Sequence, residues 1–271
     1  MERTIISNAR IVTPSDNFIG SCVLENGLIC DITNKNYASC HFDLQEGWLL
    51  PGCIDIHTDQ LELEINPRPG TAFSLASALY SLDTRAICKG VTTLLSCLRF
   101  TQDQSKYNWM HDNVVEKSLE LERLCMNTQA RHYIQARWDT NFINTDSLLN
   151  HIKSLTLLKL LVYNENIPGN RQFRNMDTLI KKFALQHDLA LEEARKAIEK
   201  KIERNRKINN RHEVYNSING TIVIGSHDDT TPEHIEEAHT YGSTLAEMPT
   251  TIEAARAAKE HNMWICMSAA N

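Results

Sequence analysis

Residues 49–59 read LLPGCIDIHTD, a mostly apolar run that is broken once by Pro51-Gly52 and ends in His57-Thr58-Asp59. An apolar run of this length is typical of a β-strand that is buried on both faces. In parallel α/β barrels, the residues at the carboxyl ends of the strands carry the functional groups. The stretch therefore predicts the first strand of such a barrel, with His57 and Asp59 at its functional end.

After residue 59 the sequence alternates between helix-like and strand-like segments. We expect further strands at residues 91–97, 133–136, 157–163, 221–225, 243–247 and 264–267, and helical segments at 73–89, 113–126, 176–213, 232–240 and 252–261. Such alternation favours a parallel sheet with right-handed crossovers. The predicted fold class is α/β, a TIM-barrel-like domain over residues 48–271 in which about seven of eight barrel strands are present.

Residues 1–47 have a different pattern, in which short β-branched runs are separated by turn residues. The runs at 4–6 and 10–12 flank Asn8, and those at 22–24 and 28–30 flank Glu25-Asn26-Gly27. Turn residues between such runs are typical of β-hairpins. We therefore expect a small all-β piece, the N-terminal part of a β-sandwich, before the barrel.

Composition limits the classes of partner. The net charge of −6 argues against a general nucleic-acid binder, which would need a basic face, and no apolar run is long enough to span a bilayer. The eight cysteines include no C-x-x-C pair, and no export signal is evident, so reduced thiols and a cytoplasmic location are expected.

Two strand ends carry residues that suit a divalent metal. His57 and Asp59 can turn an imidazole and a carboxylate toward one point, and His227 and Asp228 follow the strand expected at 221–225. The alternative for the first pair is a core histidine with a turn aspartate, and Asp229 can begin the next helix. Because packing leaves His227 and Asp228 unexplained, we expect a metal site, with zinc as the ion.

Two arginines suggest an anionic substrate. Arg68 lies between prolines, and Arg171 follows the strand expected at 157–163. An arginine with a restricted backbone can bind phosphate through two parallel hydrogen bonds. The alternative is that each belongs to a surface turn. The sequence has no G-x-x-x-x-G-K-[ST] loop, so nucleotide binding of that kind is not indicated.

Seven motifs, in this order along the whole chain, resemble the amidohydrolase-superfamily diphosphatases of the carbon–phosphorus lyase pathway, which are phosphonate metabolism proteins. They are WLLPG at 48–52, HTDQLE at 57–62, PRPG at 67–70, GVTT at 90–93, PGNRQF at 168–173, SHDD at 226–229 and AEMPTT at 246–251. The resemblance implies a barrel beside a small β-sandwich built from both chain ends.

The resemblance also implies an activity and a set of site residues. The activity is hydrolysis of α-D-ribose 1-methylphosphonate 5-triphosphate to the 5-phosphate and pyrophosphate, so the expected partner is a small phosphorylated sugar phosphonate. The implied metal ligands are His57, Asp59 and His227. Asp228 is the implied catalytic residue, as a proton acceptor or a group behind the ligands, and Arg68 and Arg171 are implied to bind the polyphosphate.

The sequence departs from the pattern of that family in three places. Arg137 stands where the family has a carboxylate, and Asn166 stands where it has a histidine, although Glu165 could substitute. The sequence ends at Asn271, before the eighth strand and the returning sandwich strands. The alternative function is therefore a degenerate or truncated family member that binds a ligand or a pathway partner without turnover, or a fragment. An open barrel edge would also allow a homodimer.

Overall fold

The computed structural model describes residues 2–68, 70–100, 114–143, 145–165, 167, 171, 175–205, 207–218 and 220–268. The chain divides into two compact units, residues 1–53 and 54–271. Each unit has a sheet of its own. Among the described helices, none has the length and apolar character needed to cross a membrane.

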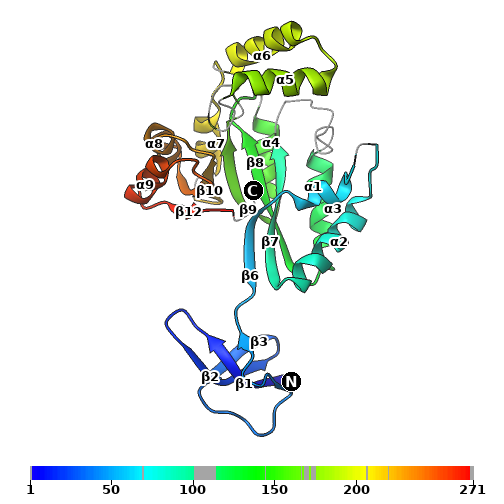
Figure 1. The fold of residues 1–271 in the computed structure, drawn as a ribbon, viewed down its shortest axis with the longest axis vertical. Helices are drawn as coiled ribbons and strands as arrows, with labels where there is room; N and C mark the ends of the chain where they lie inside the picture. Colours follow the sequence, from blue (N-terminus) through cyan, green and yellow to red (C-terminus); the bar gives the residue numbers. More distant parts are fainter. Residues whose placement is uncertain are drawn as a thin grey trace. The chain divides into compact units, whose positions relative to one another are not determined.

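The first unit is a small β-sheet in which β1 and β2, and β2 and β3, pair antiparallel (Figure 1). The short strands β4 and β5 both pair parallel with β1. Its strands are β1 Arg3–Val12, β2 Asn17–Glu25, β3 Leu28–Thr33, β4 Phe42–Asp43 and β5 Trp48–Leu49. The expected hairpin between β2 and β3 is present. Asn26 and Gly27, with φ of 51° and 80°, form its two-residue turn.

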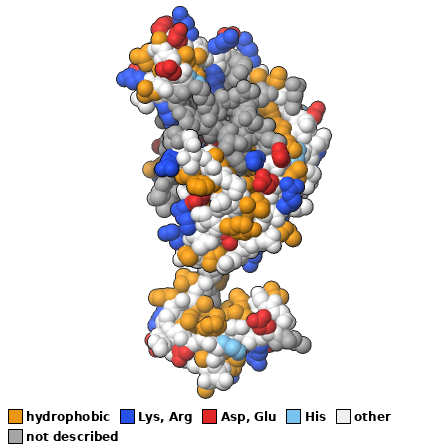
Figure 2. Space-filling view, turned by 90° about the vertical axis from the view of Figure 1, so that its right-hand side faces the viewer, with side chains coloured by type: hydrophobic (Ala, Val, Ile, Leu, Met, Phe, Trp, Pro, Cys, Tyr) orange, Lys and Arg blue, Asp and Glu red, His pale blue; other side chains and the backbone are white. Residues whose placement is uncertain are grey.

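The two runs that flank Asn8 belong to one strand, β1, and not to two. Asn8 has a φ of 51°, and the register of β1 against β2 shifts between Ile6 and Ala9. The asparagine therefore marks a β-bulge inside a strand, where the sequence suggested a turn. The core of the unit is small, and Figure 2 shows hydrophobic side chains on its surface. Leu28, Phe42 and Trp48 are among the exposed ones.

The second unit is built on a seven-stranded sheet in the order β12-β11-β10-β9-β8-β7-β6 (Figure 1). Its pairs from β7 to β12 are parallel. The strands are β6 Cys53–Thr58, β7 Val91–Phe100, β8 Arg131–Asp139, β9 Leu158–Asn164, β10 Val223–His227, β11 Ser243–Glu247 and β12 Trp264–Cys266. This confirms the predicted fold class, a TIM-barrel-like α/β sheet with seven strands in a chain that also has a separate N-terminal β-sheet.

Helices connect these strands, and most lie where the sequence predicted them. They are α1 Gln60–Ile65, α2 Leu75–Cys88, α3 Val114–Cys125, α4 Asp146–Ser154, α5 Met176–His187, α6 Leu191–Asn205, α7 Arg211–Ile218, α8 Pro232–Thr240 and α9 Ile252–Glu260. The sequence did not predict α1 and α4. The single helical segment expected at 176–213 is three helices, and the first ends at Asp188, which has a left-handed φ of 53°.

The strand expected from Leu49 to Ile56 is divided at Pro51-Gly52. Trp48 and Leu49 pair with β1 in the first unit, whereas β6 begins at Cys53. Proline lacks the N–H group that would continue a ladder, so the chain leaves one sheet before it enters the other. The boundary expected after residue 47 accordingly lies within the first unit.

The two faces of the sheet in the second unit pack in different hydrophobic clusters. Residues such as Leu98, Phe100, Trp138 and Leu161 pack in one large cluster with α2, α3 and α4, where Trp138 and Phe100 are fully buried. A smaller cluster, formed by Leu95, Leu160, Val162 and Leu245, packs separately from it. Side chains alternate across each strand, so residues two positions apart share a side. Cys97 and Arg99 therefore lie on the same side of β7 as Leu95.

Candidate metal centre

Three side chains from the carboxyl ends of β6, β10 and β11 converge in the second unit. His57 Nδ1 lies 3.0 Å from Glu247 Oε2, and His227 Nε2 lies 3.8 Å from the same oxygen. The centres of the two imidazole rings are 5.3 Å apart. Each of the three residues can place one ligand atom within 4.8 Å of the others, which is the spacing expected of groups that share a metal ion.

The ligand atoms of this cluster are buried but make no hydrogen bonds. This is true of His57 Nδ1, His227 Nε2 and Glu247 Oε2 within the described part of the chain. The 3.0 Å contact between His57 and Glu247 has the distance of an ion pair without the orientation of a hydrogen bond. A buried polar atom without a partner costs free energy unless a ligand or a cation satisfies it. Two imidazoles and a carboxylate are ligands that zinc and similar ions prefer, so these residues fit a divalent metal.

A second group shares His57 and adds Asp59 and Cys97. Asp59 Oδ2 lies 3.6 Å from His57 Nε2, on the other edge of the imidazole ring. Asp59 is half exposed, and one terminal nitrogen of Arg137 lies 3.3 Å from each of its carboxylate oxygens. The aspartate predicted as a metal ligand is therefore close to the cluster but already paired with an arginine.

The electrostatics of both groups favour positive charge near His57. Burial alone would lower the pKa of His57, but Asp59, Cys97 and Glu247 outweigh it and raise the pKa to about 12. Burial alone would raise the pKa of the Asp59 carboxyl, but His57 and Arg137 hold that pKa well below its usual range. A site that stabilises positive charge at its centre is suited to a cation.

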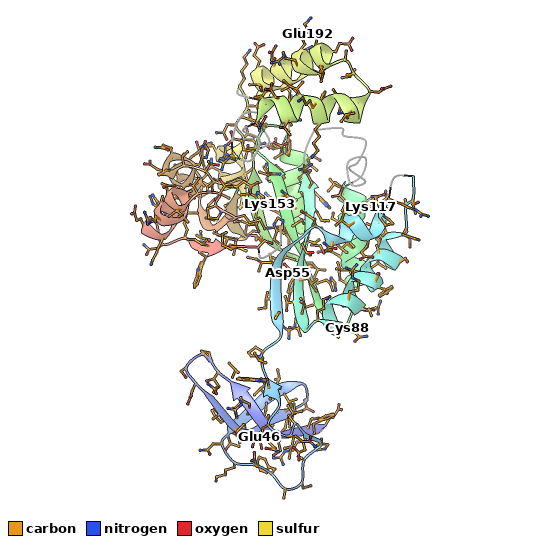
Figure 3. All side chains as sticks on the ribbon, viewed as in Figure 1. Glu46, Asp55, Cys88, Lys117, Lys153 and Glu192 are labelled. Atoms are coloured by element: carbon orange, nitrogen blue, oxygen red, sulfur yellow. The ribbon has the colours of Figure 1, made fainter. Side chains whose placement is uncertain are left out.

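Neighbouring residues orient the three candidate ligands. Gln135 of β8 donates from Nε2 to Glu247 Oε1 at 2.8 Å and accepts a hydrogen bond from the Cys97 thiol, so Glu247 Oε2 faces the histidines. The backbone N–H of His57 donates to Asp55 of the same strand, labelled in Figure 3, at 3.0 Å. Partners behind the ligands fix their direction and strengthen metal binding.

Asp228 lies directly behind His227. Its Oδ2 is 2.8 Å from His227 Nδ1, which leaves Nε2 of the same ring directed at Glu247. Asp228 has a φ of 56°, and its backbone N–H donates to the carbonyl of Glu247 at 3.0 Å. The turn after β10 therefore attaches to the end of β11. The sequence predicted Asp228 to be a proton acceptor or a group behind the ligands, and the structure places it next to His227, a candidate ligand.

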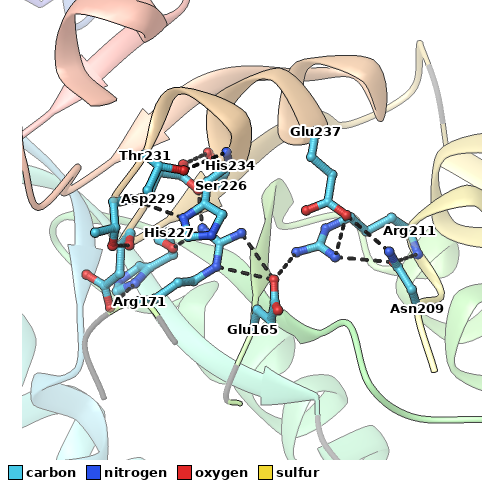
Figure 4. A network of polar contacts seen from close by, with 12 residues as sticks. Glu165, Arg171, Asn209, Arg211, Ser226, His227, Asp229, Thr231, His234 and Glu237 are labelled. Carbon is cyan, nitrogen blue, oxygen red and sulfur yellow. Dashed lines mark hydrogen bonds and ion pairs between the residues drawn. The ribbon is translucent and has the colours of Figure 1, made fainter. Parts of the chain in front are cut away.

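Arg171, predicted to bind substrate, is buried in a network of charges (Figure 4). Its guanidinium pairs with Asp229 and, at 3.2 Å, with Glu165, and it also donates to the backbone carbonyl of His227 at 3.4 Å. Glu165 pairs in addition with Arg211 of α7 at 2.8 Å. Arg171 thus faces two carboxylates and supports the chain at His227.

The remaining predicted positions lie outside the cluster. Arg68 is exposed, and its Nε donates to the Thr71 hydroxyl at 3.1 Å within its own loop. Glu165, considered as a substitute ligand, is paired with arginines and does not belong to either metal group found among the described residues. Asn166 lies outside the described residues.

Arginines other than the predicted ones line the cavity beside the cluster. Arg99 of β7 and Arg137 of β8 border a cavity of about 540 Å³ together with His57, His227 and Asp228. They also border an adjoining cavity of about 610 Å³. Burial, and then the neighbouring Arg137, lower the pKa of the Arg99 guanidinium.

Sequence reasoning missed Glu247, Gln135, Cys97 and Arg99. Glu247 had a usable signal, because it ends a predicted strand in the way that His57 and His227 end theirs. Cys97 lies within the strand predicted at 91–97, and Arg99 lies just beyond it. Nothing in the sequence alone distinguishes a side chain that faces the site from one that packs in the core. Gln135 acts through its contacts with other side chains, which no local pattern reveals.

A parallel α/β sheet with a histidine–carboxylate cluster at the carboxyl ends of its strands is the arrangement of metal-dependent barrel hydrolases. The chain is 28% identical, over 273 residues, to the curated alpha-D-ribose 1-methylphosphonate 5-triphosphate diphosphatase of Escherichia coli (strain K12). The match covers 98% of this chain and 72% of that enzyme. The resemblance expected from the motifs is confirmed.

Other comparisons give weaker likeness. A D-hydantoinase structure aligns with a TM-score of 0.48 at 15% identity over 91% of this chain. The L-hydantoinase (dihydropyrimidinase) of Arthrobacter aurescens aligns with a TM-score of 0.46 at 12% identity over 90% of it. The chain spans 57% of the length of each of these structures. No protein-family model matches the sequence.

Proposed function

We propose that this chain is a metal-dependent phosphoanhydride hydrolase of phosphonate degradation. The observation that carries the proposal is the set of buried ligand atoms of His57, His227 and Glu247, which converge without hydrogen bonds. Similarity along nearly the whole chain to a diphosphatase supports the reaction class. When bound, a divalent ion supplies stabilisation for the charge that develops on phosphoryl oxygens.

The residues around the cluster have separate roles in this proposal. Gln135 holds Glu247 through a hydrogen bond, so this ligand is oriented before an ion arrives, and Asp228 lies 2.8 Å from His227 Nδ1. Asp228 also borders the cavity, where its carboxylate can accept a proton from the attacking water. Asp59 can become a further ligand only if its ion pair with Arg137 breaks.

The proposed substrate is α-D-ribose 1-methylphosphonate 5-triphosphate. Water adds to the phosphorus nearest the sugar, the anhydride bond to the next phosphate breaks, and pyrophosphate leaves the 5-phosphate behind. The name of the curated relative supports the substrate, and the arginines that border the cavity provide charge of the required sign.

One observation favours a second candidate, a relative that binds its ligand without turnover. Arg137 lies 3.3 Å from both oxygens of Asp59 and so occupies the carboxylate that a second ion would need. A guanidinium cannot ligate a metal and repels one. Turnover then depends on a single ion at His57, His227 and Glu247.

The test is metal content together with pyrophosphate release. The purified chain is saturated with zinc, freed of excess ion and measured by elemental analysis, and pyrophosphate is then followed with the ribose phosphonate triphosphate as substrate. We expect about one bound ion per chain and release of pyrophosphate. A folded chain that binds no ion and releases no pyrophosphate would refute the hydrolase, whereas bound substrate without release would support the second candidate.

A matched pair of histidine variants locates the ion. His227→Ala should lose the ion and the activity, because it removes a ligand that is buried in the cluster. His212→Ala is the control, since His212 is exposed on α7 and its side chain hydrogen-bonds only with Asn216 among the described residues. Retention of the ion by His227→Ala would show that the proposed ligand set is wrong.

A further inference from the structure

Arg99 and Arg137 occupy matching positions on neighbouring strands. They are direct partners in the parallel pairing of β7 with β8, so their side chains leave the sheet on the same side. The residues that follow them, Phe100 and Trp138, stack on the opposite side with ring centres 5.9 Å apart. Both arginines therefore leave the sheet on the side of the metal cluster, and both border the cavity that His57 and His227 line.

Within the described residues, the two positive charges are not fully compensated. Arg137 is 12% exposed, and its pairing with Asp59 uses only a terminal nitrogen. Its Nε is buried and makes no hydrogen bond among the residues that the structure describes. Within the part of the chain that the structure describes, Arg99 makes neither a hydrogen bond nor an ion pair. The carboxylates of Asp139, Glu62 and Asp59 favour the charge of Arg99 only from a distance.

Like charges directly opposite each other on neighbouring strands destabilise a sheet. An anion between them reverses the sign of the interaction, and a tetrahedral oxyanion has enough oxygens to accept hydrogen bonds from two guanidinium groups at once. A single carboxylate offers only two oxygens for the same purpose. The arrangement is therefore better suited to phosphate than to carboxylate.

We propose that Arg99 and Arg137 form a subsite for a phosphate or pyrophosphate group in the cavity that also contains His57 and Asp59. The identity of the whole substrate rests on the proposed function. The binding of an oxyanion by the two arginines is independent of it. Neither arginine was predicted to bind substrate, and Arg171, which was, is already held between carboxylates. The subsite places the phosphate chain beside the candidate metal ligands.

Calorimetric titration with inorganic pyrophosphate tests the subsite directly. The chain is treated with a chelator first, so that binding does not depend on a metal, and phosphate and acetate are titrated for comparison. We expect pyrophosphate to bind, phosphate to bind more weakly and acetate not to bind. Arg99→Gln should weaken pyrophosphate binding about tenfold, which is one good charged interaction, and Arg99→Lys should restore part of it.

Arg131→Gln is the matched control, because Arg131 is exposed at the opposite end of β8. Thermal unfolding of each variant confirms that the fold is kept. Absence of pyrophosphate binding to the wild-type chain, equal binding by Arg99→Gln, or equal binding of acetate would each overturn the subsite. Metal uptake and hydrolysis unaffected by Arg99→Gln would leave the proposed function intact and remove only this inference. Pyrophosphate binding by a chain that hydrolyses no substrate would support the subsite and count against the proposed function.

Discussion

At the scale of single residues, Glu247 connects most of the candidate site. One carboxylate oxygen faces both histidines, and the other accepts a hydrogen bond from Gln135. Its backbone carbonyl accepts a hydrogen bond from Asp228, which in turn contacts His227. A fully buried glutamate with these contacts can hold a cation without moving. Asp59 is the candidate ligand least available to a metal, because its carboxylate is paired with Arg137.

Arg137→Gln should strengthen metal binding. The change removes a positive charge from beside Asp59 and frees a carboxylate that can join His57, so the affinity for Zn²⁺ should rise about tenfold, equivalent to 1.4 kcal/mol. Titration of the metal-free chain with Zn²⁺ measures the affinity, with Arg131→Gln as the control. Unchanged or weaker binding by Arg137→Gln would contradict the competition between Arg137 and the metal.

The sequence could predict those candidate ligands that directly end a strand and belong to a familiar motif. His57, Asp59 and His227 do so, and the structure places Asp59 and His227 each near His57, in two separate groups that share this histidine. The sequence could not predict that Arg171 faces both Glu165 and Asp229, because Asp229 comes from a separate segment 58 residues further along the chain. Charge alone does not reveal whether an arginine meets a substrate or a carboxylate of its own chain.

At the scale of elements, an alternating series of charges ties α7 to the turn after β10 (Figure 4). Arg211 contacts Glu165, Glu165 contacts Arg171, and Arg171 contacts Asp229. Burial alone would raise the pKa of Glu165, but Arg211 and Arg171 hold it below its ordinary value. Glu165 therefore stabilises the fold as a carboxylate between two buried arginines.

Glu165→Gln should destabilise the second unit by about 3 kcal/mol, because it leaves two buried guanidinium groups without their shared carboxylate. Glu237→Gln is the matched control, since Glu237 contacts Arg211 at 3.4 Å from a side chain that is 35% exposed. It should cost less than about 1 kcal/mol. Urea unfolding measures both. Equal effects of the two variants would show that the network does not support the fold.

A second set of polar contacts joins α2 to the start of β8, and the stability that it gives depends on pH. Asp83 accepts hydrogen bonds from the backbone of Gln129 and Ala130 and contacts His132 at 3.0 Å. Burial alone would raise the pKa of Asp83, but these contacts lower it below its ordinary value of 3.8. A lowered carboxyl pKa gives stability that is present above the unfolded pKa and is lost as the pH falls through the folded one.

Asp83→Asn should therefore cost about 2 kcal/mol at pH 6, the worth of hydrogen bonds to a charged group, and progressively less as the pH falls below 4. Asp188→Asn is the control, because Asp188 is exposed at the end of α5 and its left-handed backbone also suits asparagine. Urea unfolding across this pH range measures the difference. A cost that does not change with pH would mean that the charge of Asp83 contributes nothing.

The elements themselves were largely predictable, because strands buried on both sides and helices with capping residues have strong local signals. Thr231 and Thr251, for example, cap α8 and α9 through their side chains. The failures occurred where a local signal has two meanings. Asn8 suits a turn or a bulge, and an apolar run does not say which of two sheets its residues join, as Leu49 and Cys53 illustrate.

At the scale of the whole molecule, the proposed function depends on one property of the parallel sheet. The carboxyl ends of β6, β10 and β11 meet although His57 and Glu247 are far apart in the sequence, and the strands between them carry the two arginines. The candidate metal ligands and the proposed phosphate-binding arginines therefore share one edge of one sheet, as the proposed hydrolysis of a polyphosphate requires.

The most direct test of this account is a crystal structure of the zinc-loaded chain with anomalous diffraction at the zinc edge. We predict one strong anomalous peak bonded to His57, His227 and Glu247, at about 2.0–2.2 Å from their ligand atoms, with Arg137 still against Asp59. Zinc bound by other residues, or no peak at this cluster in crystals saturated with zinc, would contradict the metal centre and the function built on it.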